Sequence, residues 1–124
     1  DGFETIAPIP ALYLLGHGIE LSLKAYLLEH GSTLSELKVL GHNLSRSFDK
    51  ANEHDLHQLV SFEERQLSAF KILDELYSTK QLEYIVTGPK QFPIFGPLQL
   101  FSVKLFNAVA GSVGFRKRFE GFLA

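Results

Sequence analysis

Hydrophobic residues recur at helical spacing in four stretches of the chain. Apolar positions three and four residues apart lie on one side of a helix, which is the pattern of a helix packed on a core. The stretches with this pattern are 11–30, 42–51, 56–77 and 98–110. A glycine follows the first and last stretches, and glycine commonly ends helices. The pattern therefore predicts an all-α domain.

The segments between these stretches are predicted to be connections. Residues 32–40 predict a short connection with at most one helical turn, begun by Ser32 or Ser35. In residues 82–87, Leu82, Tyr84 and Val86 alternate with Glu83, Ile85 and Thr87, and a Gly-Pro pair follows. We therefore expect a short extended segment there. Residues 92–97 hold two prolines and a glycine and predict a loop. The expected fold is an up-and-down bundle of four to five helices with a short extended segment near 82–87.

Two glycines, Gly16 and Gly18, fall inside the first predicted helix. Each glycine destabilises a helix interior by about 1 kcal/mol relative to alanine. Tertiary packing has to offset this loss. We therefore expect a neighbouring helix to approach closely at both glycines.

Composition narrows the class of protein. A chain of 124 residues, 45% hydrophobic and 21% charged, fits one globular domain, 1–124. The formal net charge of −2 gives the whole chain no electrostatic attraction for nucleic acid. The chain contains no cysteine, which excludes disulfides and thiolate metal sites and fits a cytoplasmic protein. No apolar run approaches the roughly 20 residues that cross a membrane, so we expect no membrane association.

One group of polar residues falls among apolar ones. Glu20 and Lys24 are four residues apart, with the acid first, which favours an ion pair within a helix. His17 lies on the same side of that helix, and His42 from the next helix is the natural partner. The favoured interpretation is a polar cluster that fixes how the two helices pack. The alternative is that Lys24 and His42 contact a phosphate of a nucleotide or RNA.

Two further polar residues follow His42. Asn43 stands at the predicted start of a helix, where asparagine is a good cap. Arg46 shares a helix face with His42 and could hold a phosphate through two hydrogen bonds. Capping is the expected role of Asn43, and the role of Arg46 stays open.

The other polar groupings predict no catalytic or metal site. Glu53, His54, Asp55 and His57 are close in sequence, and a helix would bring His54 and His57 together. No third strong ligand follows at a recognisable spacing, and metal sites generally need three or four. A solvated turn is the expected role of this segment. The chain has no Gly-x-Ser-x-Gly nucleophile motif and no phosphate-binding glycine loop with its lysine. We expect no catalytic residues, no metal and no cofactor.

The end of the sequence interleaves cations and aromatic residues. Residues 115–119 read Phe-Arg-Lys-Arg-Phe, a combination that can stack bases and contact phosphates. Three charges without a wider basic surface would bind nucleic acid weakly. The simpler expectation is an arm that packs its phenylalanines on the bundle or on a second subunit.

Two motifs carry a family resemblance. Residues 18–31, Gly-Ile-Glu-Leu-Ser-Leu-Lys-Ala-Tyr-Leu-Leu-Glu-His-Gly, resemble the central helix signature of HEPN domains. Residues 41–44, Gly-His-Asn-Leu, resemble the motif that follows, with Asn43 where aspartate is common. The resemblance covers residues 10–51. It implies a helical bundle, often dimeric, that acts as an RNA-cutting toxin, as a partner of a nucleotidyltransferase-like antitoxin, or as a non-catalytic binding module.

The sequence departs from the RNA-cutting members of that family. They place an arginine, a spacer of roughly four to six residues and then a histidine. Here Arg46 precedes His54 with seven residues between them, and the other three arginines have no histidine after them. The resemblance therefore implies a non-catalytic HEPN-like interaction module in a defence or toxin–antitoxin setting, with at most weak binding of RNA or a nucleotide. The alternatives are an RNase toxin that uses His42 and Arg46, and a structural dimerisation domain.

Two protein partners are expected, a nucleotidyltransferase-like protein and a second copy of the chain. The homodimer is predicted because the first and last helices are apolar over more than one side. Such helices must be covered by the bundle or by another subunit. In the last helix the residues concerned are Leu100, Phe101, Leu105 and Phe106.

Overall fold

The computed structural model describes residues 9–79 and 95–113, and the regular structure of this part is entirely α-helical. The prediction of an all-α fold is confirmed. The predicted extended segment near 82–87 and the Phe-Arg-Lys-Arg-Phe segment lie outside the described residues. The helices are α1 Ile9–Glu29, α2 Leu34–Leu40, α3 Leu44–Glu53, α4 Leu56–Leu59, α5 Glu64–Ser78 and α6 Phe95–Ser112.

The predicted connection at 32–40 is wrong, because it contains the helix α2. Thr33, not Ser32 or Ser35, begins this helix. The Thr33 hydroxyl accepts a hydrogen bond from the Glu36 backbone N–H at 3.1 Å, and the Glu36 carboxylate accepts one from the Thr33 N–H at 2.9 Å. This reciprocal pair is a capping box, and it supplies partners for N–H groups that a helix start otherwise leaves unpaired.

The predicted helix 56–77 is divided into α4 and α5. The chain is extended at Val60 and Glu63, and α5 begins after Glu63. The Gln66 side chain fixes this start, because its Oε1 accepts hydrogen bonds from the Glu63 N–H at 2.9 Å and from Nζ of Lys104 at 3.0 Å.

Helix α6 is longer than predicted at both ends. It begins at Phe95, inside the expected loop, and Pro97 occupies its first turn. A proline is tolerated there because the first N–H groups of a helix have no partner within it. Gly111 lies inside the helix, which ends at Ser112.

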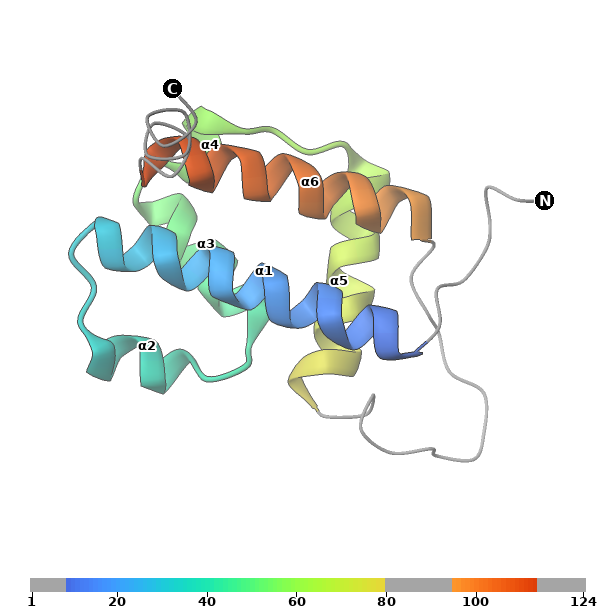
Figure 1. Ribbon diagram of the computed structural model, residues 1–124, viewed down its shortest axis with the longest axis horizontal. Coiled ribbons are helices and arrows are strands. Elements are labelled where there is room, and N and C mark those ends of the chain that lie inside the picture. Colours follow the sequence, from blue (N-terminus) through green and yellow to red (C-terminus); the bar gives the residue numbers. More distant parts are fainter. Residues whose placement is uncertain (1–8, 80–94, 114–124) are drawn as a thin grey trace, which may run out of the picture.

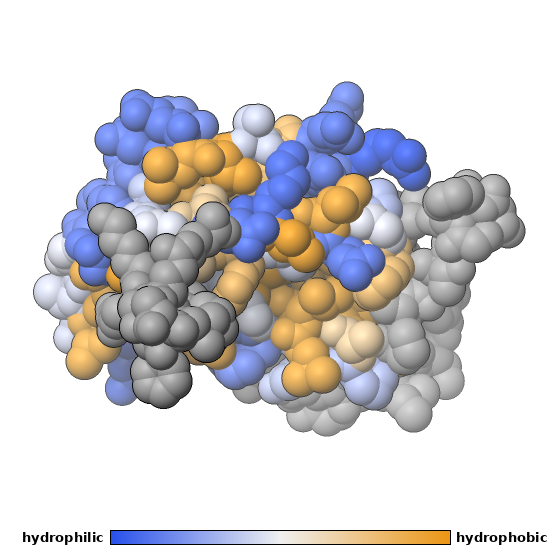
Figure 2. Space-filling view, turned by 45° about the horizontal axis from the view of Figure 1, so that its top comes forward, coloured by the Kyte–Doolittle hydropathy of each residue, from blue (hydrophilic) through white to orange (hydrophobic). Residues whose placement is uncertain are grey.

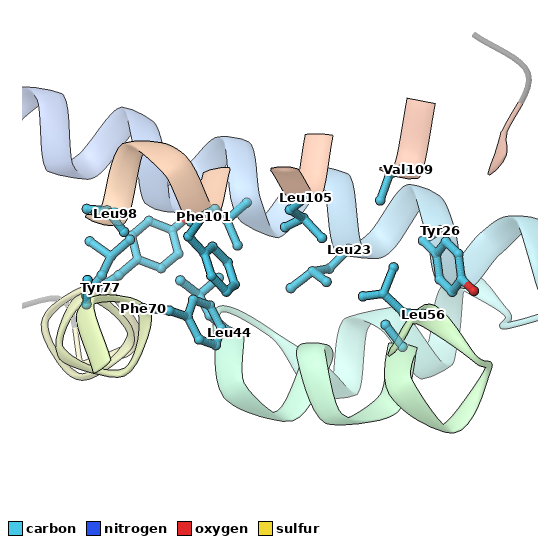
Figure 3. Close-up of a cluster of buried hydrophobic side chains, with 14 of the residues drawn as sticks. Leu23, Tyr26, Leu44, Leu56, Phe70, Tyr77, Leu98, Phe101, Leu105 and Val109 are labelled. Carbon is cyan, nitrogen blue, oxygen red and sulfur yellow. The ribbon is translucent and has the colours of Figure 1, made fainter. Parts of the chain in front are cut away.

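The helices surround one core, but they do not simply alternate in direction. Helices α1 and α6 lie side by side and run in the same direction, and α3 packs on another side of α1 (Figure 1). Helix α5 crosses these helices instead of running along them (Figures 1 and 3). The end of α5 therefore reaches α1 and the start of α3, where the candidate polar residues lie.

The core is built from leucines and stacked aromatic rings. Phe101 of α6 is fully buried and stacks on Phe70 and Phe62, with ring centroids 4.5 and 4.3 Å apart. Phe48 of α3 packs against the same rings, 5.1 Å from Phe70 and 5.7 Å from Phe101. The core also contains buried leucines of several helices, among them Leu23, Leu44, Leu56, Leu98 and Leu105 (Figure 3). No helix within the described ranges is both long enough and apolar enough to span a membrane.

The two glycines of α1 differ in their surroundings. A Cβ atom on Gly16 would lie 2.5 Å from Cδ1 of Tyr77, so the tyrosine ring occupies the space of a side chain. Among the described residues, no atom lies within 4 Å of a Cβ on Gly18. The expected close approach of a helix is confirmed at Gly16 and wrong at Gly18.

Candidate functional site

The turn before α3 is held by the last residues of α5. The Leu44 N–H donates a hydrogen bond to Oδ1 of Asp74 at 2.7 Å, and the Ser78 hydroxyl lies 2.8 Å from the carbonyl oxygen of His42. Ser78 also bonds to the Asp74 carboxylate. A carboxylate at a helix N-terminus is favoured by the helix dipole. These bonds place His42 beside α1 and α5.

Glu20 is the centre of a polar cluster formed by α1, α5 and this turn. Its side chain is 7% exposed. Oε1 accepts hydrogen bonds from Nδ1 of His42 at 2.8 Å and from the Tyr77 hydroxyl at 2.7 Å. Oε2 accepts one from Nζ of Lys24 at 2.7 Å. Nδ1 of His17 lies 3.4 Å from the Tyr77 hydroxyl. The structure thus brings together the four candidates His17, Glu20, Lys24 and His42.

The pKa of Glu20 is set by opposing effects. Burial raises it, because a charged carboxylate loses hydration. Hydrogen bonds from His42, Lys24 and Tyr77, together with the charge of Lys24, act in the other direction, and the pKa ends below its ordinary value of 4.5. Glu20 is therefore ionised at neutral pH, and its two oxygens are occupied by internal donors.

Two of the sequence candidates are not bonded to this cluster. Asn43 caps α3, since its Oδ1 accepts a hydrogen bond from the Arg46 N–H at 3.0 Å. The Arg46 side chain is exposed, and no side chain in the described residues binds its guanidinium group. His42 is joined to the cluster through Nδ1, and its side chain is 54% exposed. Its Nε2 makes no hydrogen bond within the described ranges.

Tyr77 is a member of the cluster that the sequence did not indicate. It appeared only as the last apolar position of a predicted helix. Its ring packs over Gly16 and lies edge-on to the ring of His42, with centroids 5.9 Å apart. The sequence did contain one signal for an aromatic partner. Gly16 and Glu20 are four residues apart, so they lie on the same side of α1, and the missing side chain at Gly16 leaves space for a ring whose hydroxyl reaches the Glu20 carboxylate.

His54 and Asp55 form the turn between α3 and α4, and His57 lies in α4. The Tyr26 hydroxyl donates a hydrogen bond to the His54 carbonyl at 2.6 Å, and Nδ1 of His57 lies 3.2 Å from the carbonyl of Asn52. Asp55 has a left-handed backbone, with φ 68°, which aspartate tolerates better than most residues. Within residues 9–79 and 95–113, no three histidine, cysteine or acidic side chains are placed to hold a metal ion.

A second surface feature runs along the outer side of α1. Steps of four and three residues place five positions on one side of the helix, and all five are exposed. The leucines among them are strongly exposed, Leu14 at 69%, Leu21 at 55% and Leu28 at 46%. We name this set the α1 stripe; it consists of Leu14, Gly18, Leu21, Ala25 and Leu28.

Helix α6 extends the apolar surface beside the α1 stripe. Phe106 is 55% exposed and contributes to the lining of two hollows between α1 and α6, of about 210 and 130 Å³. Leu21 and Ala25 line the larger hollow, and Leu14 and Gly18 line the smaller. Hydrophobic side chains are exposed in several patches when α6 is turned toward the viewer (Figure 2).

The apolar character of α6 is divided between the core and the surface. Phe101 and Leu105 are fully buried, whereas Leu100 and Phe106 are each 55% exposed. The prediction that α6 is apolar on more than one side is confirmed, and Leu100 and Phe106 are the two of the four named residues that are exposed. The sequence indicated that α1 and α6 are apolar on several sides, but it did not identify the α1 stripe.

The chain was compared with models of protein families, with curated proteins and with solved structures. None of these comparisons found a match. The polar cluster and the apolar surface are therefore the observations from which a function has to be argued.

Proposed function

We propose that this chain is a non-catalytic, HEPN-like interaction module whose contact surface is the α1 stripe together with Phe106. The observation that carries the proposal is the row of three exposed leucines on one side of α1. Leucines on a monomer's surface are ordinary when scattered, but an aligned row beside apolar hollows is typical of an interaction site. In this role the module binds a partner that presents an apolar helix.

The polar cluster supports the HEPN-like part of the proposal. Glu20 belongs to the first of the two resembling motifs and His42 to the second, and they are joined by a 2.8 Å hydrogen bond. This hydrogen bond connects the two motifs, so both are required to form the same polar cluster. We assign the cluster a packing role, since the carboxylate of Glu20 is buried and bound by three internal donors. A buried charge left without such partners would strongly destabilise the fold.

The interaction role is tested with a co-expressed partner. In a toxin–antitoxin or defence setting, the first protein to try is the one encoded beside this chain, a nucleotidyltransferase-like protein in the favoured case. Leu21→Glu should abolish a complex, because it places a charge in the middle of the α1 stripe. Val39→Glu is the matched control, since Val39 is 72% exposed on α2. Equal binding by both variants would contradict the proposed surface.

A second candidate function is metal-independent RNA cleavage. It is favoured by His42, whose Nδ1 is bound to Glu20 while its exposed ring leaves Nε2 for another partner. Carboxylates orient catalytic histidines in this way. We expect no cleavage, because the Arg-spacer-His motif is absent and Arg46 is not bonded to the cluster. The test is to incubate mixed RNA with the wild-type protein and, separately, with His42→Ala. Cleavage by the wild type that is lost in His42→Ala would establish RNase activity.

A further inference from the structure

We propose that residues 114–124 bind the α1 stripe of their own chain and compete there with the partner protein. These residues lie outside the described ranges, and we name them the arm. This inference rests on the proposed function, because it concerns the regulation of the surface described there. It is carried by the place where the described residues end, by the spacing of the phenylalanines in the arm, and by the hollows beside the stripe.

The described residues end at the rim of the larger hollow. Val113, the last of them, lines that hollow together with Leu21 and Ala25 of the α1 stripe. The arm therefore starts beside the stripe and needs no further linker to reach it. Its first residue is Gly114, and glycine is the residue type that most readily lets a chain leave a helix and reverse. A reversed arm runs back along the two hollows between α1 and α6, toward Leu14.

The phenylalanines of the arm match the small residues of the α1 stripe in spacing. Phe115, Phe119 and Phe122 are separated by steps of four and three, which place them on one side of a helix. Phe115 and Phe122 are seven residues apart, which is about 10 Å along a helix. Gly18 and Ala25 are separated by the same interval. With the two helices antiparallel, Phe115 lies at Ala25 and the larger hollow. Phe122 then lies at the smaller hollow, which Gly18 helps to line. Large residues opposite small ones allow facing layers to interdigitate.

The two hollows have the size and the lining that aromatic rings require. Their volumes are about 210 and 130 Å³. An apolar cavity of about 150 Å³ holds a molecule of benzene. Apart from two serines, the described residues that line the hollows are all apolar. The phenylalanines of the arm therefore gain by leaving water at this surface.

Charge also permits the arm to bind here. Lys117 and Glu120 fall on the side of the arm opposite its phenylalanines, so a bound arm keeps these charges in water. The α1 stripe contains no charged residue. Lys24, the lysine of α1, has its ammonium group held on Glu20 at 2.7 Å. The basic arm therefore meets no unpaired lysine or arginine on α1.

A tethered arm needs little intrinsic affinity to occupy the α1 stripe. A short linker keeps it at an effective concentration of about 1 mM, so a segment that binds at about 0.1 mM is bound in about nine molecules of ten. The partner then finds the stripe open in about one molecule of ten, which weakens its binding about tenfold. A single leucine contributes only part of this preference, so shortening Leu21 leaves the stability of the fold almost unchanged.

The first experiment measures access to the α1 stripe with an introduced thiol, which is unique because the chain contains no cysteine. Leu21→Cys in the chain of 124 residues is labelled with a maleimide. In this background Phe119→Ser should raise the labelling rate about tenfold, because it removes the central ring of the arm. Lys117→Ser, on the opposite side of the arm, is the matched control and should leave the rate unchanged. Equal rates in the two variants would overturn the inference.

The second experiment determines the direction of the arm with pairs of cysteines. Leu14→Cys combined with Ala124→Cys should be cross-linked within one chain by a short bis-maleimide, because an antiparallel arm ends near Leu14. Leu28→Cys combined with Ala124→Cys is the control, since Leu28 lies at the other end of the same stripe, and it should stay unlinked. A link to position 28 in place of position 14 would overturn the antiparallel arrangement. A product with twice the chain mass of 13.9 kDa would place the arm on a second copy, which also overturns the inference.

The third experiment tests competition with the nucleotidyltransferase-like protein of the co-expression test. Phe119→Ser should bind this protein about tenfold more tightly than the wild type, and Lys117→Ser should bind it like the wild type. An unchanged affinity of Phe119→Ser would overturn the competition. Failure of the proposed function has a different result: Leu21→Glu and Val39→Glu then bind the partner equally, whatever labelling and cross-linking show about the arm.

Discussion

Gly16 and Gly18 are two residues apart on α1, but they face different surroundings. Gly16 faces inward, where the ring of Tyr77 fills the space that a side chain would need. Gly18 faces outward, among exposed leucines, and no atom in the described part of the chain lies within 4 Å of its Cβ position. The same residue type therefore makes room for an aromatic ring at one position and contacts no other described helix at the other. The comparison teaches that α1 has two apolar sides, one packed against other helices and one with exposed leucines.

The largest expected effect comes from shortening leucines on the two sides of α1. Leu23 is fully buried, so Leu23→Ala should lower the free energy of unfolding by about 2–5 kcal/mol. Leu21 is 55% exposed, and Leu21→Ala should change the free energy of unfolding by no more than about 0.5 kcal/mol in dilute, monomeric protein. Urea denaturation measures both values. Equal losses would show that the outer side is also covered within the monomer.

The next effect concerns the polar cluster on the closed side. Glu20→Gln keeps the shape of the side chain but removes the charge that pairs with Lys24, and it should destabilise the fold by about 1.5–3 kcal/mol. Glu29→Gln on the exposed surface of the same helix is the matched control and should change stability by less than about 0.5 kcal/mol. A Glu20→Gln protein as stable as the wild type would contradict a packing role for the cluster.

Substitution of each glycine by alanine should change the stability of the fold in opposite directions. Gly16→Ala should destabilise the fold by about 1–3 kcal/mol, because the new methyl group would overlap the Tyr77 ring. Gly18→Ala should stabilise the monomer by about 0.5–1 kcal/mol, since alanine favours the helix and no described residue obstructs the added methyl group. Thermal unfolding of dilute protein is sufficient for this comparison. If both variants changed the melting temperature in the same direction, the Tyr77 ring would not limit the space for a side chain at position 16.

The smallest expected effect is a dependence on pH. The pKa of Glu20 is lower in the folded chain than its ordinary value of 4.5, so the folded state binds fewer protons than the unfolded state near and below that pH. The stability that Glu20 contributes is therefore complete above pH 4.5 and declines as pH falls through the folded pKa. The difference in melting temperature between wild type and Glu20→Gln should narrow as pH falls below 4.5. A constant difference would exclude this linkage.

The sequence predicted the helices better than their arrangement. Apolar spacing located most of α1, α3 and α6, because a helix that packs on a core repeats its contacts every three to four residues. The missed helix α2 had a local signal, the Thr33 and Glu36 capping pair. The approach of α5 to the start of α3 had none, since the bond from Leu44 to Asp74 joins residues that are distant in the chain.

The candidate site was predictable to a similar extent. Glu20, Lys24 and His42 were grouped by helical spacing and by the need of a buried charge for partners. Tyr77 was missed because it contacts α1 only as a result of the way α1 and α5 cross. The sequence does not show which turn of α5 meets α1. The α1 stripe was missed because exposure depends on which side the other helices leave uncovered.

The pairing of α1 with α6 has a consequence for how the chain folds as it is made. Helix α1 is synthesised first among the described helices and α6 last, yet they pack side by side. Until α6 emerges from the ribosome, the residues of α1 that it will cover remain exposed along with the α1 stripe. Contacts between such distant segments slow folding relative to a bundle of successive neighbours. Nascent chains should therefore be most prone to associate just before α6 is released, when α1 is apolar on both sides.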